Sequence, residues 1–283
     1  MADTRRQKKN RLTAGNADRH LLYEASVQVV DADINFVRRV YRNARARVPL
    51  RMREDFCGTA MLATEWVKSN QNHEAWGVDL DPEVLEWARA HRFEAMGDAA
   101  RRMHLIEGDV MTARIPPVDI VVAFNFSYCI FKQRAALRTY FESVLAGLDK
   151  DGILVLDLFG GTDSFSTLEE DRYISGDRGP DGRTIPPFTY EWEHARFNPI
   201  TNELLCHIHF KFKDGTRMRN AFTYDWRLWT IPELRELLEE AGFSASLVYT
   251  HGWDEDEESD GIYRKKMAFK NEESWLAYIV GVK

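Results

Sequence analysis

The 283-residue sequence predicts an α/β protein with a seven-stranded, mostly parallel β-sheet, helices on both faces and an antiparallel β insertion after the fifth strand. Two observations support this fold class. Short, nearly continuous apolar runs alternate with helical segments, as in parallel strands that are buried on both faces. Further along the chain, apolar and polar residues alternate strictly, which indicates antiparallel strands with one exposed face.

The parallel sheet is predicted from apolar runs that helical patterns separate. Strands are expected at 50–56, 75–79, 104–107, 118–124, 153–159, 244–250 and 275–282. Helices are expected at 60–69, 132–148 and 232–241, and another begins at Asp81 and Pro82. Proline suits the first helical position because its missing N–H would have no partner there. A further helix at 18–47 is expected to cover the sheet.

The insertion follows Gly160 and Gly161. Residues 162–182 are rich in Gly, Asp and Ser, so we expect a loop or lid there. Three alternating strands follow, and a turn at Asp214 and Gly215 joins the last two. We therefore divide the chain into a flexible basic tail at 1–17, a cover helix and core at 18–160, the lid loop and β insertion on the substrate side at 161–228, and the completion of the core sheet at 229–283.

The composition excludes several classes of protein. With 44% hydrophobic and 29% charged residues, the chain is of the globular type. No segment has the roughly 20 apolar residues of a membrane-spanning helix, and the N-terminus has no apolar signal core, so we expect a cytoplasmic protein without a membrane partner. The three cysteines lie far apart, so neither a disulfide framework nor a metal site is expected.

The charge distribution argues against a nucleic-acid partner. The formal net charge is −7, and acidic residues are concentrated at 254–260. Such a balance opposes binding to phosphate backbones. The basic run at 5–11 is the exception, but terminal segments without apolar residues are usually solvated tails.

Three segments at predicted strand ends carry the candidate binding chemistry. The turn after the first strand contains Gly58, where backbone can approach a nucleotide closely and the next helix begins. Asp79 ends the second strand 21 positions later, close to the roughly 20 expected for a carboxylate that binds ribose hydroxyls. Gly108 and Asp109 follow the third strand and supply a carboxylate that can accept from an adenine amino group.

In this order, the three segments resemble the class I S-adenosylmethionine-dependent methyltransferases over 50–159 and the last helix and two strands. The resemblance implies a Rossmann-like fold, S-adenosyl-L-methionine as cofactor and S-adenosyl-L-homocysteine as product. It places Glu54 near the methionine amine, Asp79 at the ribose, Asp109 at the adenine and Asn125 beside the transferred methyl group. The other cofactor-binding residues that it implies are Phe56, Cys57, Gly58, Thr59, Leu80, Gly108, Val110 and Phe126.

The turn itself reads EDFCGTA from Glu54 to Ala60 and is similar to the first motif of a bacterial and algal subfamily. Phe56 and Ala60 stand where the wider family usually has glycine. The neighbouring acids Glu54 and Asp55 leave open which carboxylate faces the ligand. Cys57 is interpreted as a small packing residue, because no histidine lies near it in the sequence.

Asn125, Tyr128 and Arg227 are the candidate catalytic residues. The run from Asn125 to Tyr128 loosely resembles the Asn/Asp-Pro-Pro-aromatic motif of methyltransferases that act on nucleic-acid amino groups, but it lacks both prolines. We therefore expect these residues to lie beside the methyl donor and to face a small molecule. Arg227 either holds a substrate carboxylate in a bidentate pair or forms a surface salt bridge.

Aromatic and histidine side chains mark the insertion. Either they form a wall that stacks on a substrate amine or flat ring, or they are the core of the insertion. His207 and His209 share a strand face, but two ligands do not make a metal site. The alternating aromatic-face residues are Tyr190, Trp192, His194, Phe222, Tyr224 and Trp226.

These observations predict an enzyme that moves a methyl group from S-adenosyl-L-methionine to a nitrogen or oxygen of a small metabolite by in-line displacement. Because the donor sulfonium is already activated, the protein mainly has to align the acceptor lone pair. The alternatives are an RNA methyltransferase, a nicotinamide-dependent oxidoreductase, and a catalytically silent binding module on the same fold.

Overall fold

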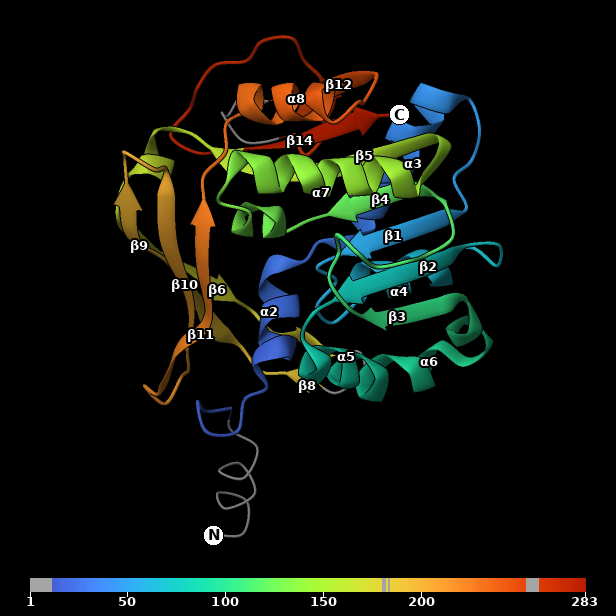
Figure 1. Ribbon diagram of the computed structural model, residues 1–283. Coiled ribbons are helices and arrows are strands. Elements are labelled where there is room, and N and C mark those ends of the chain that lie inside the picture. The colour runs from blue at the N-terminus through green and yellow to red at the C-terminus, as the bar shows by residue number, and fades with distance from the viewer. Residues whose placement is uncertain (1–11, 180–181, 183, 253–259) are drawn as a thin grey trace, which may run out of the picture. The chain divides into compact units, whose positions relative to one another are not determined.

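The computed structural model describes residues 12–179, 182, 184–252 and 260–283 (Figure 1). They form two compact units, which join residues distant in the sequence. The larger unit consists of 29–165 and 227–283, and the smaller one of the residues up to 28 and 166–226. The basic run at 5–11, most of the tail expected at 1–17 and the acidic run at 254–258 lie outside the described residues.

The larger unit contains an eight-stranded sheet in the order β13-β12-β14-β5-β4-β1-β2-β3. Strands β1 to β5 pair in parallel, and β14 is antiparallel to both of its neighbours. The strands are β1 (Arg51–Asp55), β2 (Glu74–Asp79), β3 (Met103–Glu107), β4 (Val118–Ala123), β5 (Leu148–Gly160), β12 (Ala245–Thr250), β13 (Arg264–Lys265) and β14 (Trp275–Val282). This confirms the predicted mostly parallel sheet, to which the two-residue β13 adds an edge.

Helices cover both faces of this sheet (Figure 1). Helices α3 and α4 contact each other on one face, and α7 and α8 contact each other on the opposite face. The helical elements are α3 (Val30–Arg45), α4 (Met61–Lys68), α5 (Pro82–Ala88), the π-helix η1 (Arg89–Phe93), α6 (Glu94–Met96), the 3-10 helices η2 (Gly97–Arg102), η3 (Ser127–Ile130) and η4 (Thr162–Phe165), α7 (Arg134–Gly147) and α8 (Ile231–Glu240). No helix in the described ranges is long and apolar enough to cross a membrane.

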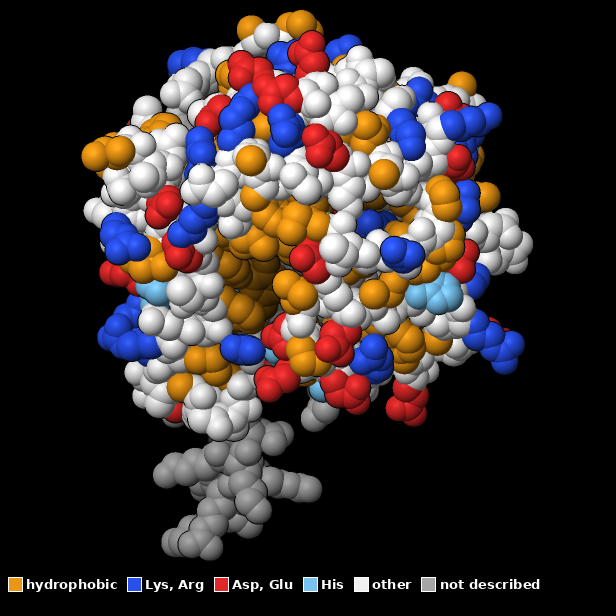
Figure 2. Space-filling view, viewed as in Figure 1, with side chains coloured by type: hydrophobic (Ala, Val, Ile, Leu, Met, Phe, Trp, Pro, Cys, Tyr) orange, Lys and Arg blue, Asp and Glu red, His pale blue; other side chains and the backbone are white. Residues whose placement is uncertain are grey.

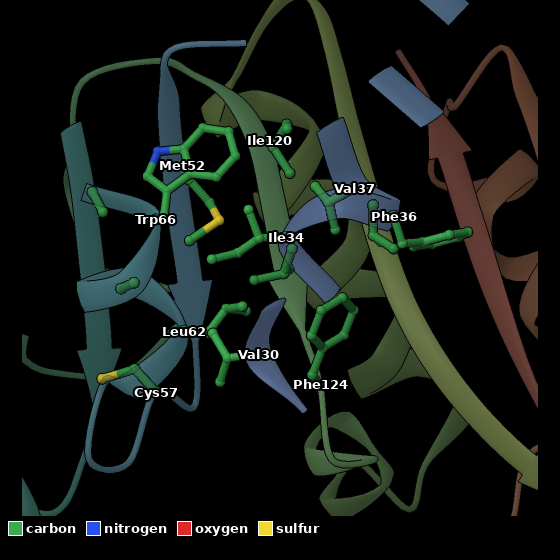
Figure 3. Close-up of a cluster of buried hydrophobic side chains, with 14 of the residues drawn as sticks. Val30, Ile34, Phe36, Val37, Met52, Cys57, Leu62, Trp66, Ile120 and Phe124 are labelled. Carbon is green, nitrogen blue, oxygen red and sulfur yellow. The ribbon is translucent and has the colours of Figure 1, made fainter. Parts of the chain in front are cut away.

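The main core lies between the sheet and the α3–α4 layer. Figure 3 shows Ile34 and Val37 of α3 packing with Leu62 of α4 and Met52 of β1. Every residue of β4 is buried, including Asp119, and the other five are the apolar residues that predicted the strand. This core holds the carboxyl ends of the strands at one edge of the sheet, where ligands bind in open α/β folds.

The prediction of a single helix at 18–47 is wrong, because two helices occupy this range. Helix α2 (Arg19–Val27) belongs to the smaller unit and α3 to the larger one. At the end of α2, the Ser26 hydroxyl donates to the Leu22 carbonyl at 2.6 Å, and Gln28 is extended. Back-bonding of this kind competes with regular helix geometry, while the apolar pattern continues across the break.

The smaller unit contains a four-stranded antiparallel sheet in the order β11-β10-β9-β6. Its strands are β6 (Leu168–Ile174), β9 (Phe188–Asn198), β10 (Glu203–Lys211) and β11 (Arg217–Arg227), and a separate pair joins β7 (Asp177–Arg178) to β8 (Thr184–Ile185). Leu22 of α2 packs in the same apolar cluster as Phe188 and Phe210. The loop expected at 162–182 is partly wrong, since β6 pairs along β9; its residues are mostly exposed and carry no apolar pattern.

Candidate functional site

The turn after β1, the end of β2 and the turn after β3 lie together in the larger unit. The Gly58 amide donates to Oδ2 of Asp79 at 2.8 Å, and the Gly108 amide donates to the Asp79 carbonyl at 2.9 Å. The other Asp79 carboxylate oxygen accepts from the Asp81 amide at 3.0 Å. The 21-residue spacing between Gly58 and Asp79 therefore corresponds to a direct contact.

The backbone of the turn is left-handed at three alternate residues. Phe56, Gly58 and Ala60 have φ of 57°, 51° and 53°. This conformation is strained for residues with a Cβ, and such strain collects at ligand-binding loops. The turn keeps this geometry although two of its three residues are not glycine. A Cβ built on Gly58 would meet nothing within 4 Å, so the space beside this residue is open.

The two neighbouring acids of the turn have different partners. Asp55 is buried and accepts from Arg53 Nε at 2.5 Å and from the Tyr140 hydroxyl at 2.9 Å. Glu54 accepts from the Ala63 amide at 2.8 Å, one of the free N–H groups at the start of α4. Asp55 therefore binds buried side chains inside the larger unit.

Burial raises the pKa of Glu54 to about 8. The Ala63 amide and the Arg92 charge oppose this rise, whereas the negative charges of Asp79 and Asp33 add to it. Glu54 thus lies within electrostatic range of Asp79, at the carboxyl edge of the sheet. A cationic ligand group there would stabilise the ionised carboxylate.

A second strained turn follows β4. Asn125 and Phe126 are consecutive left-handed residues, with φ of 57° and 58°. The Asp157 carboxylate of β5 accepts from their amides at 2.7 and 2.9 Å. The Tyr128 side chain is fully buried, and its hydroxyl donates to the Asp157 carbonyl at 2.8 Å. Asp157 was missed in the sequence, although its signal is visible as the one acid inside the apolar run 153–159.

Tyr278 and Asp33 lie next to Asp157 and connect it to α3. Tyr278 of β14 is the direct antiparallel partner of Asp157, so both side chains are on the same face. Its hydroxyl donates to Oδ1 of Asp33 on α3 at 2.5 Å, and its ring stacks on Phe36 with centroids 4.1 Å apart. Burial raises the pKa of Asp33 to about 6 and that of Asp157 to about 7. The sequence offered no signal for Asp33, because its partner is 245 residues away.

Arg227 is engaged within the chain. Its guanidinium donates to the Lys132 carbonyl at 3.1 Å and to Glu233 Oε1 at 2.9 Å, and it lies over the Trp229 ring at 3.9 Å. Glu233 also completes the capping box of α8 with Thr230. The salt bridge considered from the sequence is therefore present.

The remaining predicted cofactor residues surround the turn. Cys57 is buried against Gly77, where a Cβ would lie 2.9 Å from the Cys57 sulfur. Asp109 is half-buried and accepts from the Met111 amide at 2.8 Å. Val110 is buried, and its carbonyl accepts from Arg53, whereas the Leu80 side chain is 66% exposed.

The aromatic side chains of the insertion pack within the smaller unit. Tyr224 and Trp226 stack with ring centroids 4.4 Å apart, and Trp192 lies 6.0 Å from Tyr224. Several remain partly exposed against the apolar cluster of the unit. His209 pairs with Glu193 at 2.8 Å. Within the described ranges, no three potential metal ligands gather in one place.

The fold matches solved structures at low sequence identity. An S-adenosylmethionine-dependent methyltransferase from Clostridium acetobutylicum has a TM-score of 0.63 and 18% identity over 92% of this chain and 96% of its own. CalS10, an amino pentose methyltransferase from Micromonospora echinaspora, has a TM-score of 0.59 and 15% identity over 92% of this chain and 94% of its own. The sugar N-methyltransferase KedS8 from a Streptoalloteichus species has a TM-score of 0.61 and 19% identity over 96% of this chain and 94% of its own. No protein-family model and no curated protein matches the sequence.

Proposed function

The described chain has the fold of these enzymes, and we propose that it is an S-adenosyl-L-methionine-dependent methyltransferase that acts on a small molecule. The observation that carries the proposal is the contact between Gly58, Asp79 and Gly108 at the carboxyl edge of the sheet. Residues of three separate motifs are joined there by hydrogen bonds. We also propose that the protein is located in the cytoplasm.

The residues present fit the cofactor. The Thr59 hydroxyl is buried and finds no hydrogen-bond partner in the part of the chain that the structure describes, so it is free to bind a polar ligand group. Asp79 would accept from the ribose hydroxyls, Asp109 from the adenine amino group, and Glu54 from the methionine ammonium group. Leu80 would cover the adenine ring. When bound, the cofactor supplies an electrophilic methyl group on a sulfonium.

The acceptor in this proposal is a nitrogen atom. Two of the similar structures are named as amino sugar or sugar N-methyltransferases. In this chain, Asp157 of β5 accepts from the amides of Asn125 and Phe126, where the methyl group would be presented. Asp33 of α3 accepts from Tyr278, the neighbour of Asp157 on the sheet. An amine must be neutral to attack. Carboxylates whose pKa values burial raises to about 6 and 7 can bind an ammonium group and take up its proton.

Asn125, Tyr128 and Arg227 have different roles in the proposal. Asn125 and Phe126 line the methyl position with backbone that Asp157 holds left-handed. Tyr128 acts by fixing β5 through its hydrogen bond to Asp157. Arg227 acts by fixing the start of α8 through Glu233.

Calorimetric titration with S-adenosyl-L-homocysteine tests the cofactor, and transfer of radiolabelled methyl groups to a panel of amino sugars and other small amines tests the reaction. Binding and methylation of an amine are expected. Absence of binding would overturn the proposal in favour of a silent module, and heat with a nicotinamide nucleotide instead would favour an oxidoreductase. Label found only in added RNA would favour an RNA methyltransferase. The face in Figure 2 shows basic and acidic side chains interspersed, which suits a small acceptor better.

A further inference from the structure

Arg92 contacts the cofactor turn from a separate element of the larger unit. It lies on the π-helix η1 between α5 and α6, and its side chain is only 4% exposed. Its Nε donates to the Thr59 carbonyl at 2.9 Å. A buried arginine is costly unless its charge and N–H groups are satisfied, so this placement indicates a specific task.

The π-helix explains how Arg92 reaches the turn. A π-helical turn inserts an extra residue into an α-helix and rotates the side chains that follow, and such turns are frequent at functional sites. Here Trp87 stacks on His91 with ring centroids 4.1 Å apart, and Arg92 lies over the Trp87 ring at 5.9 Å. These contacts leave the Arg92 guanidinium directed at Thr59.

The turn needs such a contact because its backbone is strained. Phe56 and Ala60 are left-handed without being glycine, and conformations of this kind persist only where surrounding contacts enforce them. The Ala60 amide donates to Cys57 within the turn, and the Arg92 bond to Thr59 anchors it from outside. The turn therefore has an anchor in η1.

We propose that Arg92 is a positioning residue that holds the turn 56–60 in its cofactor-binding conformation and supplies the positive charge that balances Glu54. This inference rests on the proposed function. Glu54 accepts from the Ala63 amide of α4 and lies within electrostatic range of Arg92 on η1, Asp79 on β2 and Asp33 on α3. Arg92 is the cation of this set. Without it, the Ala63 amide would be the one group of this set that favours ionisation of Glu54, and the two acids would oppose it.

The test compares Arg92→Met and Arg92→Lys with Arg89→Met, which changes an exposed arginine of the same π-helix. Hydrogen exchange of the free protein measures protection of the 56–60 amides, and calorimetry measures the Kd for S-adenosyl-L-homocysteine between pH 6.5 and 8.5. Arg92→Met should speed exchange in the turn at least tenfold and weaken binding at least tenfold. Arg89→Met should change neither by more than twofold.

Arg92→Lys separates the positioning of the turn from the positive charge beside Glu54. It also replaces Arg92→Met in the test if that variant does not fold. It keeps the charge but not the Nε donor, so we expect faster exchange in the turn with the wild-type pH profile of binding. If a folded Arg92 variant kept the wild-type exchange of the turn and the wild-type Kd for S-adenosyl-L-homocysteine, the role of Arg92 would be overturned and the proposed function would stand. Failure of the wild-type protein to bind S-adenosyl-L-homocysteine would overturn both the proposed function and this role.

Discussion

The Asp157 carboxylate accepts from the backbone amide of Asn125 at 2.7 Å, and thereby joins β5 to the turn that follows β4. Its second oxygen accepts the next amide, that of Phe126, at 2.9 Å. Two consecutive left-handed residues present two amides to one carboxylate in this arrangement. Asp157 is thus the structural reason why the chain turns sharply where the proposed methyl position lies.

Asp157→Asn should therefore lower the free energy of unfolding. An asparagine offers one carbonyl oxygen in place of two carboxylate oxygens, so one partly buried amide loses its partner, at a cost of about 1 kcal/mol or more. Chemical denaturation measures the change. Asp149→Asn at the start of the same strand is the control, because its partly exposed pair with Arg51 is worth less than about 1 kcal/mol. Equal stabilities of the two variants would contradict the role of Asp157.

Asp79→Ala should weaken binding of S-adenosyl-L-homocysteine by about 1–3 kcal/mol, because ribose hydrogen bonds and the Gly58 contact are both lost. Calorimetry gives the value. Asp98→Ala is the matched control, since this acid is exposed on η2. An Asp79→Ala variant that keeps wild-type affinity would remove Asp79 from the cofactor site.

The contact between Gly58, Asp79 and Gly108 was predictable because its signals are local. A glycine turn, a carboxylate at the end of β2 and a third acid after β3 follow from strand order, since parallel strands end at one edge of the sheet. Asp81 before Pro82 likewise marked the start of α5, and its side chain accepts from the Glu83 amide as a helix cap.

The group formed by Asp33, Asp157 and Tyr278 was not predictable because its contacts join distant segments. Asp33 pairs with Tyr278 across 245 residues, and no local pattern records such a pair. The break between α2 and α3 was hidden because the apolar spacing runs through it. Strand β6 exists through its pairing with β9, and its mostly exposed side chains give no periodicity.

Glu54 should make stability depend on pH. Burial raises its folded pKa from 4.5 to about 8, so the folded state binds the proton more tightly than the unfolded state does. Its contribution to stability is full below pH 4.5, falls as the pH rises from about 4.5 to 8, and is constant above that range. The fall has a slope of up to about 1.4 kcal/mol per pH unit.

Glu54→Gln should remove this slope, because glutamine does not titrate and its carbonyl oxygen can still accept from the Ala63 amide. Denaturation of both proteins at pH 5 to 8 measures the difference. Glu107→Gln, at an exposed position on β3, should keep the wild-type slope. Parallel curves for wild type and Glu54→Gln would show that Glu54 is ionised throughout this range.

Asp33→Asn should slow methyl transfer to an amine by tenfold or more while the affinity for S-adenosyl-L-homocysteine stays within twofold. The reason is that the proposed site assigns Asp33 and Tyr278 to the acceptor, whereas it assigns Gly58 and Asp79 to the cofactor. Tyr278→Phe should have a smaller effect in the same direction, because it removes the donor to Asp33 and leaves the carboxylate.

Asp31→Asn controls for charge on the same helix turn, since Asp31 is exposed.

The Asp33 carboxylate also predicts that the rate of methyl transfer depends on pH. Because burial raises the Asp33 pKa to about 6, the wild-type rate should rise with pH through about 6 as this group ionises and can receive the amine proton. Asp33→Asn should lose that rise. A wild-type rate for Asp33→Asn with every amine tested would place the acceptor nitrogen away from α3.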